Sequence, residues 1–485
     1  MTANTVLRTT FVIANTESIS LSVDLKTGTA SIDVVPVAAK PAVPVPPPAP
    51  APAPPPGLFS AQSPWNLTPV APVLGKDVVP SAKQKPWIEE AAYASKIFVA
   101  KAVDAPVTVR AKQIANALEG ADVLIPRFPA DTVPATGSDG HCEILDGNDL
   151  HSFFGLRKPA GQWVCDKYAY SSISGSGWGT VSNPDNSRAA GCSTAGGLLL
   201  KSERGMKVVP HALAIGLDKN GIKAGPVWPA TLEDYAGGYT GPFQIGALLM
   251  LPASFDAEAL ALEESRTIAR TLKLYGGRVV DATQDTMNIY AEIGSGWNRS
   301  YVDGKYSQVF DPDMQAIKAA LRPVASVTGW KDRDGKPFTP TPPRSTNLLS
   351  MRGPWKAYPG STMFGRYDAR SDLYQCEATT EALAIQQNLW THDETDKFGW
   401  QKSCWNLNPE PGTTYIVRAI GEGAITAKMQ VKKSDYKATY VGTEKLAPGQ
   451  SATIIWPNDP DTVTVIYLDK AKSAPASIRL ELFIV

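Results

Sequence analysis

Apolar and polar residues alternate along many short stretches of this chain, a pattern that predicts strands rather than helices. Residues 5–35 alternate in this way on both sides of a Lys-Thr-Gly turn, which predicts two or three strands. So few strands cannot bury a core by themselves. We therefore expect residues 1–35 to be an N-terminal β anchor that pairs with a partner or with copies of itself.

A proline-rich stretch follows at residues 36–57. Alternating Ala and Pro favour extended polyproline II, which at ~3.1 Å per residue gives a stiff spacer of roughly 50–60 Å. The alternative interpretation is a ligand for a proline-binding domain. The sequence GLFSAQSPWNLTP comes next, and we expect Phe59, Pro64 and Trp65 to be the first residues that dock into a folded core.

Residues 58–330 are predicted to form a central β-rich domain with a few helices. Helical spacing predicts short helices in WIEEAAYASKIFVAKA, from Trp87, and in KQIANALEGA, from Lys112. A longer helix is expected between a cap at Ser254 or Asp256 and the Gly-Gly stop after Tyr275. Strands are expected within 277–293, and a further short helix from Asp311.

Beyond residue 330 a charged, proline-rich segment indicates a linker, residues 331–360. Residues 361–485 then show short alternating strands separated by Gly, Pro and Asp turns, the pattern of a small β-sandwich. The predicted fold class is mainly β: an N-terminal β anchor, a polyproline spacer, a central jelly-roll or β-sandwich-like domain with a few helices, and a C-terminal β-sandwich.

The charge balance limits the partners of the chain. Among 485 residues, Lys plus Arg and Asp plus Glu each number 47, so no overall field attracts nucleic acid. No apolar run approaches the ~20 residues that span a bilayer, and the N-terminus lacks the apolar stretch of a secretion signal. We expect neither a nucleic-acid partner nor a membrane span.

The five cysteines have no CxxC spacing, which argues against a zinc ribbon or a dense disulfide framework. Free buried thiols are one interpretation, and a bridge between Cys376 and Cys404 is the alternative. A histidine-based metal site would need a third ligand, for which Asp139 or Glu143 is the nearest candidate. We predict no metal and no cofactor.

Three of the four histidines, His141, His151 and His211, fall within one stretch of the chain. Histidine titrates near neutrality and is the first candidate for acid–base chemistry. His141 and His211 are therefore the candidate catalytic pair. His141 lies where a polar turn leads into a strand, and His211 lies on an apolar strand. For each, the competing interpretation is a core histidine whose hydrogen bonds are satisfied.

A Gly- and Ser-rich region between these histidines contains aromatic and polar side chains suited to sugar rings and their hydroxyls. It either binds sugar or simply covers the edge of the core. The candidate catalytic residues here are Tyr168 and Arg188, and the candidate substrate-binding residues are Trp163, Tyr170, Trp178 and Asn183. No GxSxG elbow, P-loop or HExxH motif occurs, which leaves serine hydrolases, nucleotide hydrolases and zinc proteases without support.

The order of six segments resembles a loosely characterised family of bacterial and phage proteins. These segments are FSAQSPWN, DGHCEIL, PHALAI, GALLMLPASFD, ARTLKLYGGRVVDAT and MNIYAE, and the resemblance spans about residues 59–322. The resemblance implies an extracellular, carbohydrate-associated β-rich domain, with His141 and His211 as the site pair. The succession of anchor, spacer, central domain and terminal β-domain also resembles a phage tail fibre, tailspike or surface fibre.

The sequence therefore favours a virion-surface protein that engages, and in its enzymatic form degrades, host surface polysaccharide. In a lyase, His211 or Tyr168 would abstract a proton while Arg188 and Asn183 neutralise a uronate carboxylate. A hydrolase would instead use Asp139 with Glu143. The alternatives are a non-catalytic adhesion or decoration fibre and a secreted bacterial carbohydrate-active enzyme. Expected partners are a host glycan, other virion proteins bound through residues 1–35, and further copies of the chain, as a trimer.

Overall fold

A computed structural model describes the fold of this chain. It describes the backbone of residues 6–14, 17–24 and 29–36, and it describes residues 58–485 except for 118–119, 235–236, 303–304, 341–346, 350, 352–354, 358–362, 365–373, 377–381, 388–408 and 471–473. The spacer predicted at 36–57 lies outside the described residues from 37 onward. The chain divides into two compact units, Met1–Pro52 and Ala53–Val485.

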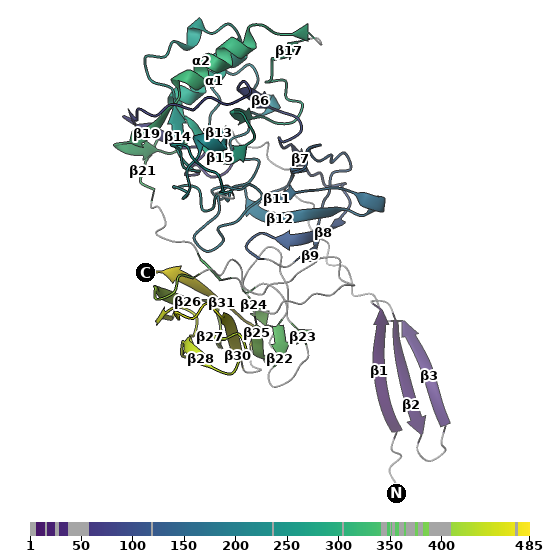
Figure 1. Cartoon of the computed structure of the whole chain (residues 1–485). Coiled ribbons are helices and arrows are strands. Elements are labelled where there is room, and N and C mark those ends of the chain that lie inside the picture. Colours follow the sequence, from purple (N-terminus) through teal and green to yellow (C-terminus); the bar gives the residue numbers. More distant parts are fainter. Residues whose placement is uncertain are drawn as a thin grey trace. The chain divides into compact units, whose positions relative to one another are not determined.

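The first unit contains three strands where alternation predicts them. These are β1 (Val6–Ala14), β2 (Glu17–Asp24) and β3 (Thr29–Pro36), paired antiparallel in that order (Figure 1). The assembly role of this segment stays a prediction.

The second unit contains a six-stranded sheet that mixes parallel and antiparallel pairs. Its order is β7 (Ile97–Val99), β10 (Cys142–Asp146), β11 (Asp149–Phe154), β12 (Val164–Ser172), β8 (Val107–Ile114) and β9 (Ala121–Ile125). Strands β10–β7 and β12–β8 run parallel, and the other neighbours are antiparallel. Apolar side chains of this sheet form a core of their own around Val109, Ile144 and Phe153.

A seven-stranded mixed sheet forms the other main layer of residues 58–330. Its order is β5 (Val73–Leu74), β19 (Arg322–Ser326), β14 (Leu248–Met250), β15 (Gly277–Thr283), β13 (Leu213–Asp218), β16 (Asn288–Tyr290) and β6 (Trp87–Glu89). The interior strand β13 pairs on both edges, and its unbroken run of buried residues, Leu213–Leu217, shows that both of its faces are covered. Two small sheets accompany it: β21 (Pro337–Phe338), β20 (Gly329–Lys331) and β4 (Thr68–Val70), and the pair β17 (Tyr301–Val302) and β18 (Lys305–Tyr306).

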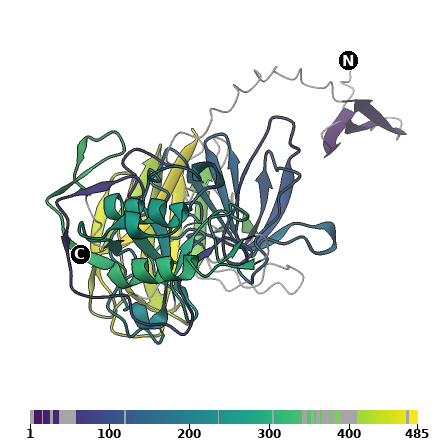
Figure 2. The same cartoon turned by 90° about the horizontal axis from the view of Figure 1, so that it is seen from above.

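Two helices pack beside this sheet, α1 (Glu263–Leu274) and α2 (Phe310–Ala320), and they lie side by side (Figures 1 and 2). Helix α1 buries Ser265, Ile268 and Leu272, which recur at helical spacing as the sequence predicts. Helix α2 likewise lies where it is expected, from the residue before Asp311.

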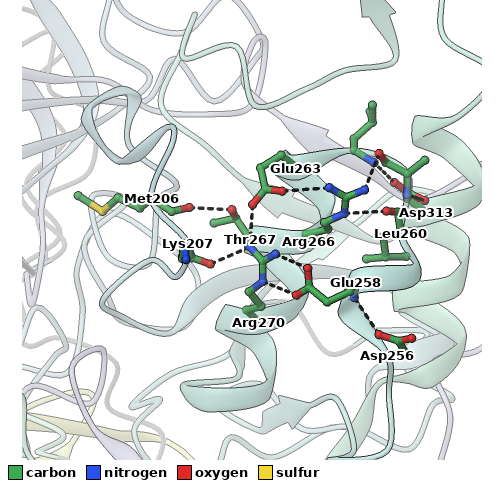
Figure 3. A network of polar contacts seen from close by, with 12 residues as sticks. Met206, Lys207, Asp256, Glu258, Leu260, Glu263, Arg266, Thr267, Arg270 and Asp313 are labelled. Carbon is green, nitrogen blue, oxygen red and sulfur yellow. Dashed lines mark hydrogen bonds and ion pairs between the residues drawn. The ribbon is translucent and has the colours of Figure 1, made fainter.

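The start of α1 is held by a polar network (Figure 3). Asp256 caps only a preceding single turn at Ala257–Ala259, so the predicted cap begins a different element. The cap of α1 comes instead from Asp313 on α2, whose carboxylate accepts hydrogen bonds from the backbone N–H groups of Ala261 and Leu262, both at 3.0 Å. A carboxylate at a helix N-terminus is favoured by unpaired N–H groups and by the helix dipole.

The helices predicted from Trp87 and from Lys112 are wrong. The first stretch forms β6 and β7, because Ile88 pairs in parallel with Ile289 and the buried Glu89 accepts hydrogen bonds from the next turn, at Ala91 N and Tyr93 N. The first residues of the second stretch, Lys112–Ile114, end β8, which runs parallel to β12, and Ala121 begins β9. Tertiary strand pairing overrides local helix propensity here.

The Ser-Pro-Trp-Asn segment docks into the core as predicted. Phe59 and Trp65 are 2% and 1% exposed, and Pro64 is buried. Trp65 stacks on Trp178 with ring centroids 4.8 Å apart. The indole lies against the backbone of Gly196, where a Cβ atom would stand 2.4 Å from the indole nitrogen.

The C-terminal part is a two-sheet antiparallel sandwich, as the turn-separated strands predict. One sheet contains β23 (Met363–Phe364), β22 (Trp355–Ala357), β25 (Ala382–Gln387), β30 (Thr462–Lys470), β27 (Ile425–Lys433) and β28 (Thr439–Gly442). The other contains β24 (Tyr374–Cys376), β31 (Ala476–Ile484), β26 (Thr414–Glu422) and β29 (Ser451–Ile455). Alternate residues such as Val417 and Met429 are buried between the sheets. The chain is mainly β, as predicted.

Cys142, Cys165 and Cys192 are free and buried. Cys404 lies outside the described residues, so its bridge to Cys376 stays a prediction. None of the helices in the described ranges has the length and apolar character needed to cross a bilayer.

Candidate functional site

A cavity of about 660 Å³ lies where residues of both main sheets meet. Its lining is mostly polar side chains from segments far apart in the sequence. Those that the chemistry uses are Asp139, His141, Arg188, Asp234, Asp281, Asn288 and Tyr290. The volume is in the usual range for small-molecule sites, which is roughly 300–1,000 Å³.

A β-bulge on β15 places the carboxylate of Asp281. Ile215 on β13 pairs with Val279, but the next residue, Gly216, pairs with Asp281, so Val280 is the extra residue. A side chain at Gly216 would collide with the neighbouring strand, because its Cβ would stand 2.4 Å from Oδ1 of Asn288. Bulges of this kind bend a strand and redirect a side chain, and they are common next to active sites.

Arg188 is a buried cation in this cavity. It is 1% exposed, its Nη1 donates to Oδ2 of Asp281 at 2.9 Å, and its Cζ lies 4.1 Å from the ring centroid of Tyr290. Burial opposes its charge, but Tyr290 and Asp281 hold the pKa of the guanidinium above its ordinary value. Nε and Nη2 have no hydrogen-bond partner among the described residues. These two nitrogens form the edge of the guanidinium that binds a carboxylate bidentately.

The carboxyl of Asp281 has a pKa above its ordinary value. Burial raises its pKa to about 6, opposed by the charge of Arg188 and reinforced by the negative charges of Asp234 and Asp139. Asp139 is better solvated, with a side chain 34% exposed. The cavity therefore combines a carboxyl that holds its proton into the mildly acidic range with a second carboxylate in contact with water.

His141 enters the cavity just before β10, as a neutral ring. Burial, together with the positive charge of Arg188, lowers its pKa to about 3. Its Nε2 lies 3.8 Å from Oδ2 of Asp139, and its Nδ1 has no hydrogen-bond partner in the described structure. A neutral imidazole at this position can hydrogen-bond a ligand hydroxyl.

His211 is not among the residues that line this cavity. Its Nε2 lies 3.1 Å from Oε1 of Glu203, and its Nδ1 lies 2.9 Å from the carbonyl of Ala212. Burial alone would lower its pKa, but the charge and hydrogen bond of Glu203 raise it. His141 therefore lines the cavity, whereas both ring nitrogens of His211 are hydrogen-bonded outside it, to Glu203 and to Ala212.

The other predicted residues, apart from Arg188, also lie away from the cavity lining. Tyr168 is fully buried, with its hydroxyl 2.9 Å from Nδ1 of His151. Trp163 packs on Phe128, Tyr170 donates to Asp149, Trp178 stacks on Trp65, and the backbone N–H of Asn183 donates to the hydroxyl of Thr180. These contacts give the residues roles in packing and in loop geometry.

Glu143, proposed from the sequence as a partner of Asp139, is fully buried and is not a cavity residue. Its carboxylate accepts hydrogen bonds from the hydroxyls of Ser152, Ser193 and Thr194 and from the N–H of Ala195. It ties β10 to the loop at 193–195. Burial raises its pKa in spite of these donors.

A second hollow of about 660 Å³ adjoins the cavity, since Gln84 and Trp87 line both. Two aromatic side chains of the β17–β18 hairpin, Tyr301 and Tyr306, line its outer part with ring centroids 5.6 Å apart. Tyr301 is 67% exposed. We call this hollow the tyrosine groove.

Four residues of the cavity were not predicted from the sequence: Asp234, Asp281, Asn288 and Tyr290. A signal for Asp281 exists: it is an acidic residue that directly follows the apolar Val279-Val280 in a predicted strand, and an acidic side chain is seldom fully buried there unless it is paired. Within the described part of the chain, no three His, Cys, Asp or Glu side chains are grouped as a metal site.

Comparisons with known proteins leave the family open. No family model matches the chain, and no curated protein matches it. Among solved structures, it is similar to a glycosylation-associated protein complex from Streptococcus agalactiae, at 14% identity and a TM-score of 0.19, over 27% of this chain and 44% of that one. It is also similar to a CBM22 tandem domain from Paenibacillus barcinonensis, at 11% identity and a TM-score of 0.18, over 50% and 78%.

A third structure is SGBP-B of the Bacteroides ovatus mixed-linkage glucan utilisation locus, in complex with a heptasaccharide. It is 10% identical with a TM-score of 0.11, over 84% of this chain and 99% of that one. TM-scores this low carry no argument about this chain. The resemblance stated from the sequence stays a prediction.

Proposed function

We propose that the Asp281 cavity binds a polysaccharide and hydrolyses one of its glycosidic bonds. The observation that carries this proposal is a carboxyl with a pKa near 6 in the same cavity as a solvated carboxylate and a buried cation. Glycoside hydrolysis characteristically uses two carboxyl groups, one as the acid and one as the base or nucleophile.

Each polar group of the cavity has a role in this reaction. Asp281 donates its proton to the glycosidic oxygen as the C–O bond breaks, and Asp139 takes a proton from the water that adds to the anomeric carbon. The net change is the addition of one water. Arg188 holds Asp281 in place through Nη1 and offers Nε and Nη2 to substrate oxygens. His141 offers Nδ1 to a sugar hydroxyl.

The tyrosine groove supports a polymeric substrate. Trp87 and Tyr301 present aromatic surface next to polar groups, which suits the apolar faces and hydroxyls of sugar rings. Because the groove and the cavity share Gln84 and Trp87, one saccharide chain can occupy both.

The test is digestion of a panel of bacterial capsular and exopolysaccharides by the full chain. Hydrolysis predicts new reducing ends without ultraviolet absorbance from unsaturated sugars. Products that carry an unsaturated sugar would indicate the lyase mechanism and contradict the roles given to Asp281 and Asp139. Binding without any cleavage of a bound polysaccharide would favour the non-catalytic adhesion fibre.

A location on the surface of a phage particle is a separate proposal. It rests on the order of the predicted segments: strands, proline-rich spacer, central domain and terminal sandwich. Antibody labelling of purified particles tests it, and a protein absent from particles but found in bacterial culture medium would favour the secreted bacterial enzyme. Sedimentation of the full chain tests the predicted trimer.

A further inference from the structure

A second buried arginine, Arg278, lies near the start of β15, outside the lining of the Asp281 cavity. It is 3% exposed. Its Nη1 donates to the carbonyl of Gly246 at 3.2 Å, and this is the hydrogen bond that the structure gives its guanidinium. Nε and Nη2 are buried and have no partner among the residues described, so the bidentate edge of the guanidinium is unpaired.

Two tryptophans enclose this guanidinium. Its Cζ lies 5.0 Å from the ring centroid of Trp228 and 5.4 Å from that of Trp330. The rings meet edge to face, with centroids 5.7 Å apart. Both tryptophans are half-buried, so part of each ring surface stays accessible. Cation–π contacts orient the guanidinium, but they supply no acceptor for its N–H groups.

The three side chains line a cavity of about 400 Å³, together with Gln244 and Val324. This cavity shares no lining residue with the Asp281 cavity. Asp77 also borders it, as an exposed residue. Within the described ranges, no carboxylate forms an ion pair with Arg278, and burial lowers the pKa of its guanidinium to about 9.

An unpaired buried charge is costly, and folded proteins normally pair such groups. Arg188 shows the usual arrangement in this same chain, since it is equally buried but bound to Asp281. A purely structural role for Arg278 would rest on one hydrogen bond and two ring contacts. A ligand carboxylate would instead satisfy both unpaired N–H groups at once.

We propose that the Arg278 cavity is a second ligand site, which binds the carboxylate of a uronic-acid-type sugar. The carboxylate accepts hydrogen bonds from Nε and Nη2, and the sugar ring packs on accessible surface of Trp228 and Trp330. This site is independent of catalysis at Asp281.

The experiment is a fluorine NMR titration of the full chain labelled with 5-fluorotryptophan. The Trp330 resonance is identified as the one absent from Trp330→Phe. D-glucuronate is expected to shift this resonance in a saturable way, and D-glucose, its neutral match, is not. Arg278→Gln abolishes the shift, while Arg278→Lys, which keeps the charge but loses the fork, binds at least about tenfold more weakly. No shift with glucuronate, or an equal shift with glucose, overturns the proposal.

Thermal unfolding of the same variants separates binding from a structural role. Because the wild type buries an unpaired charge, Arg278→Gln and Arg278→Met are expected to keep or raise the melting temperature in the absence of ligand. A clear fall in both variants would mean that Arg278 holds the fold through Gly246 and the tryptophans. That result would also overturn the proposal.

Discussion

At Glu143 the role predicted from the sequence and the role seen in the structure differ most. The sequence suggests a catalytic carboxylate, but in the structure Glu143 is a buried hydrogen-bond acceptor. We consider its replacement by alanine. The change removes the acceptor of four hydrogen bonds in a place with no solvent exposure. The hydroxyls of Ser152 and Ser193 then lose their acceptor, while the Thr194 hydroxyl keeps the hydroxyl of Ser95 and the Ala195 N–H keeps that of Ser193.

The magnitude follows from these contacts. Each buried donor left without a partner costs about 1–3 kcal/mol, and neighbouring losses are not additive because hydroxyls can turn to new acceptors. Loss of the buried side chain adds a cavity. We expect Glu143→Ala to lower the free energy of unfolding by about 3–5 kcal/mol. With a urea dependence of about 3 kcal/mol per molar, the midpoint falls by about 1 M or more.

Glu143→Gln is the matched control. Its amide oxygen can accept from Ser193, Thr194 and Ala195 in place of Oε1, and its NH₂ can donate to Ser152 in place of Oε2. Burial already favours the neutral form of this carboxyl, since its pKa is raised. We expect a loss within about 1 kcal/mol.

Urea unfolding of the full chain, followed by tryptophan fluorescence, measures both variants. The C-terminal sandwich serves as an internal reference if its transition is separate. The reasoning is refuted if Glu143→Ala unfolds at the wild-type urea concentration and instead loses polysaccharide cleavage. That outcome would return Glu143 to the catalytic role.

Three further predictions follow from packing, binding and titration. Trp65→Ala should lower the free energy of unfolding in urea by about 3–5 kcal/mol. Trp65→Phe should lower it clearly less, since the indole nitrogen has no hydrogen-bond partner in the described residues. Equal losses in the two variants would contradict the packing account. Tyr301→Ala should raise KM for a polymeric substrate and leave kcat unchanged, because the side chain lies in the groove outside the cavity; a lower kcat would contradict this. The pKa of Asp281 is about 6 in the folded chain against 3.8 ordinarily, so its protonated form favours folding. Asp281 contributes about 3 kcal/mol to the free energy of unfolding below pH 3.8, and this contribution is lost as the pH rises through 6. The free energy of unfolding of Asp281→Asn, measured between pH 4 and 7, should lack this decline.

Local patterns predict the elements whose partners are local. Helix α1 follows from apolar spacing around Ile268, and the C-terminal strands follow from alternation and turns. The stretch from Trp87 looks helical by spacing, but pairing with β16 decides its structure. The alternation of apolar and polar residues does not specify whether neighbouring strands run parallel or antiparallel. The parallel pairs of the six- and seven-stranded sheets could therefore not be predicted.

The site was predictable only in part for the same reason. His141 follows a polar turn and His211 lies on an apolar strand, but neither setting shows which of them reaches the cavity; only the fold places the first there and the second against Glu203. Asp281 depends on a bulge opposite Gly216. That bulge is a property of the strand register, which no local pattern specifies.

The central claim is that Asp281 donates the proton that breaks a glycosidic bond. The direct measurement is the pH profile of reducing-end release by the wild type, Asp281→Asn and the exposed control Asp131→Asn on one cleaved polysaccharide. We predict that wild-type kcat falls as the pH rises through about 6, that Asp281→Asn loses about 10²–10⁴-fold, and that the control matches the wild type. An Asp281→Asn variant that stays folded and cleaves at the wild-type rate would contradict the claim.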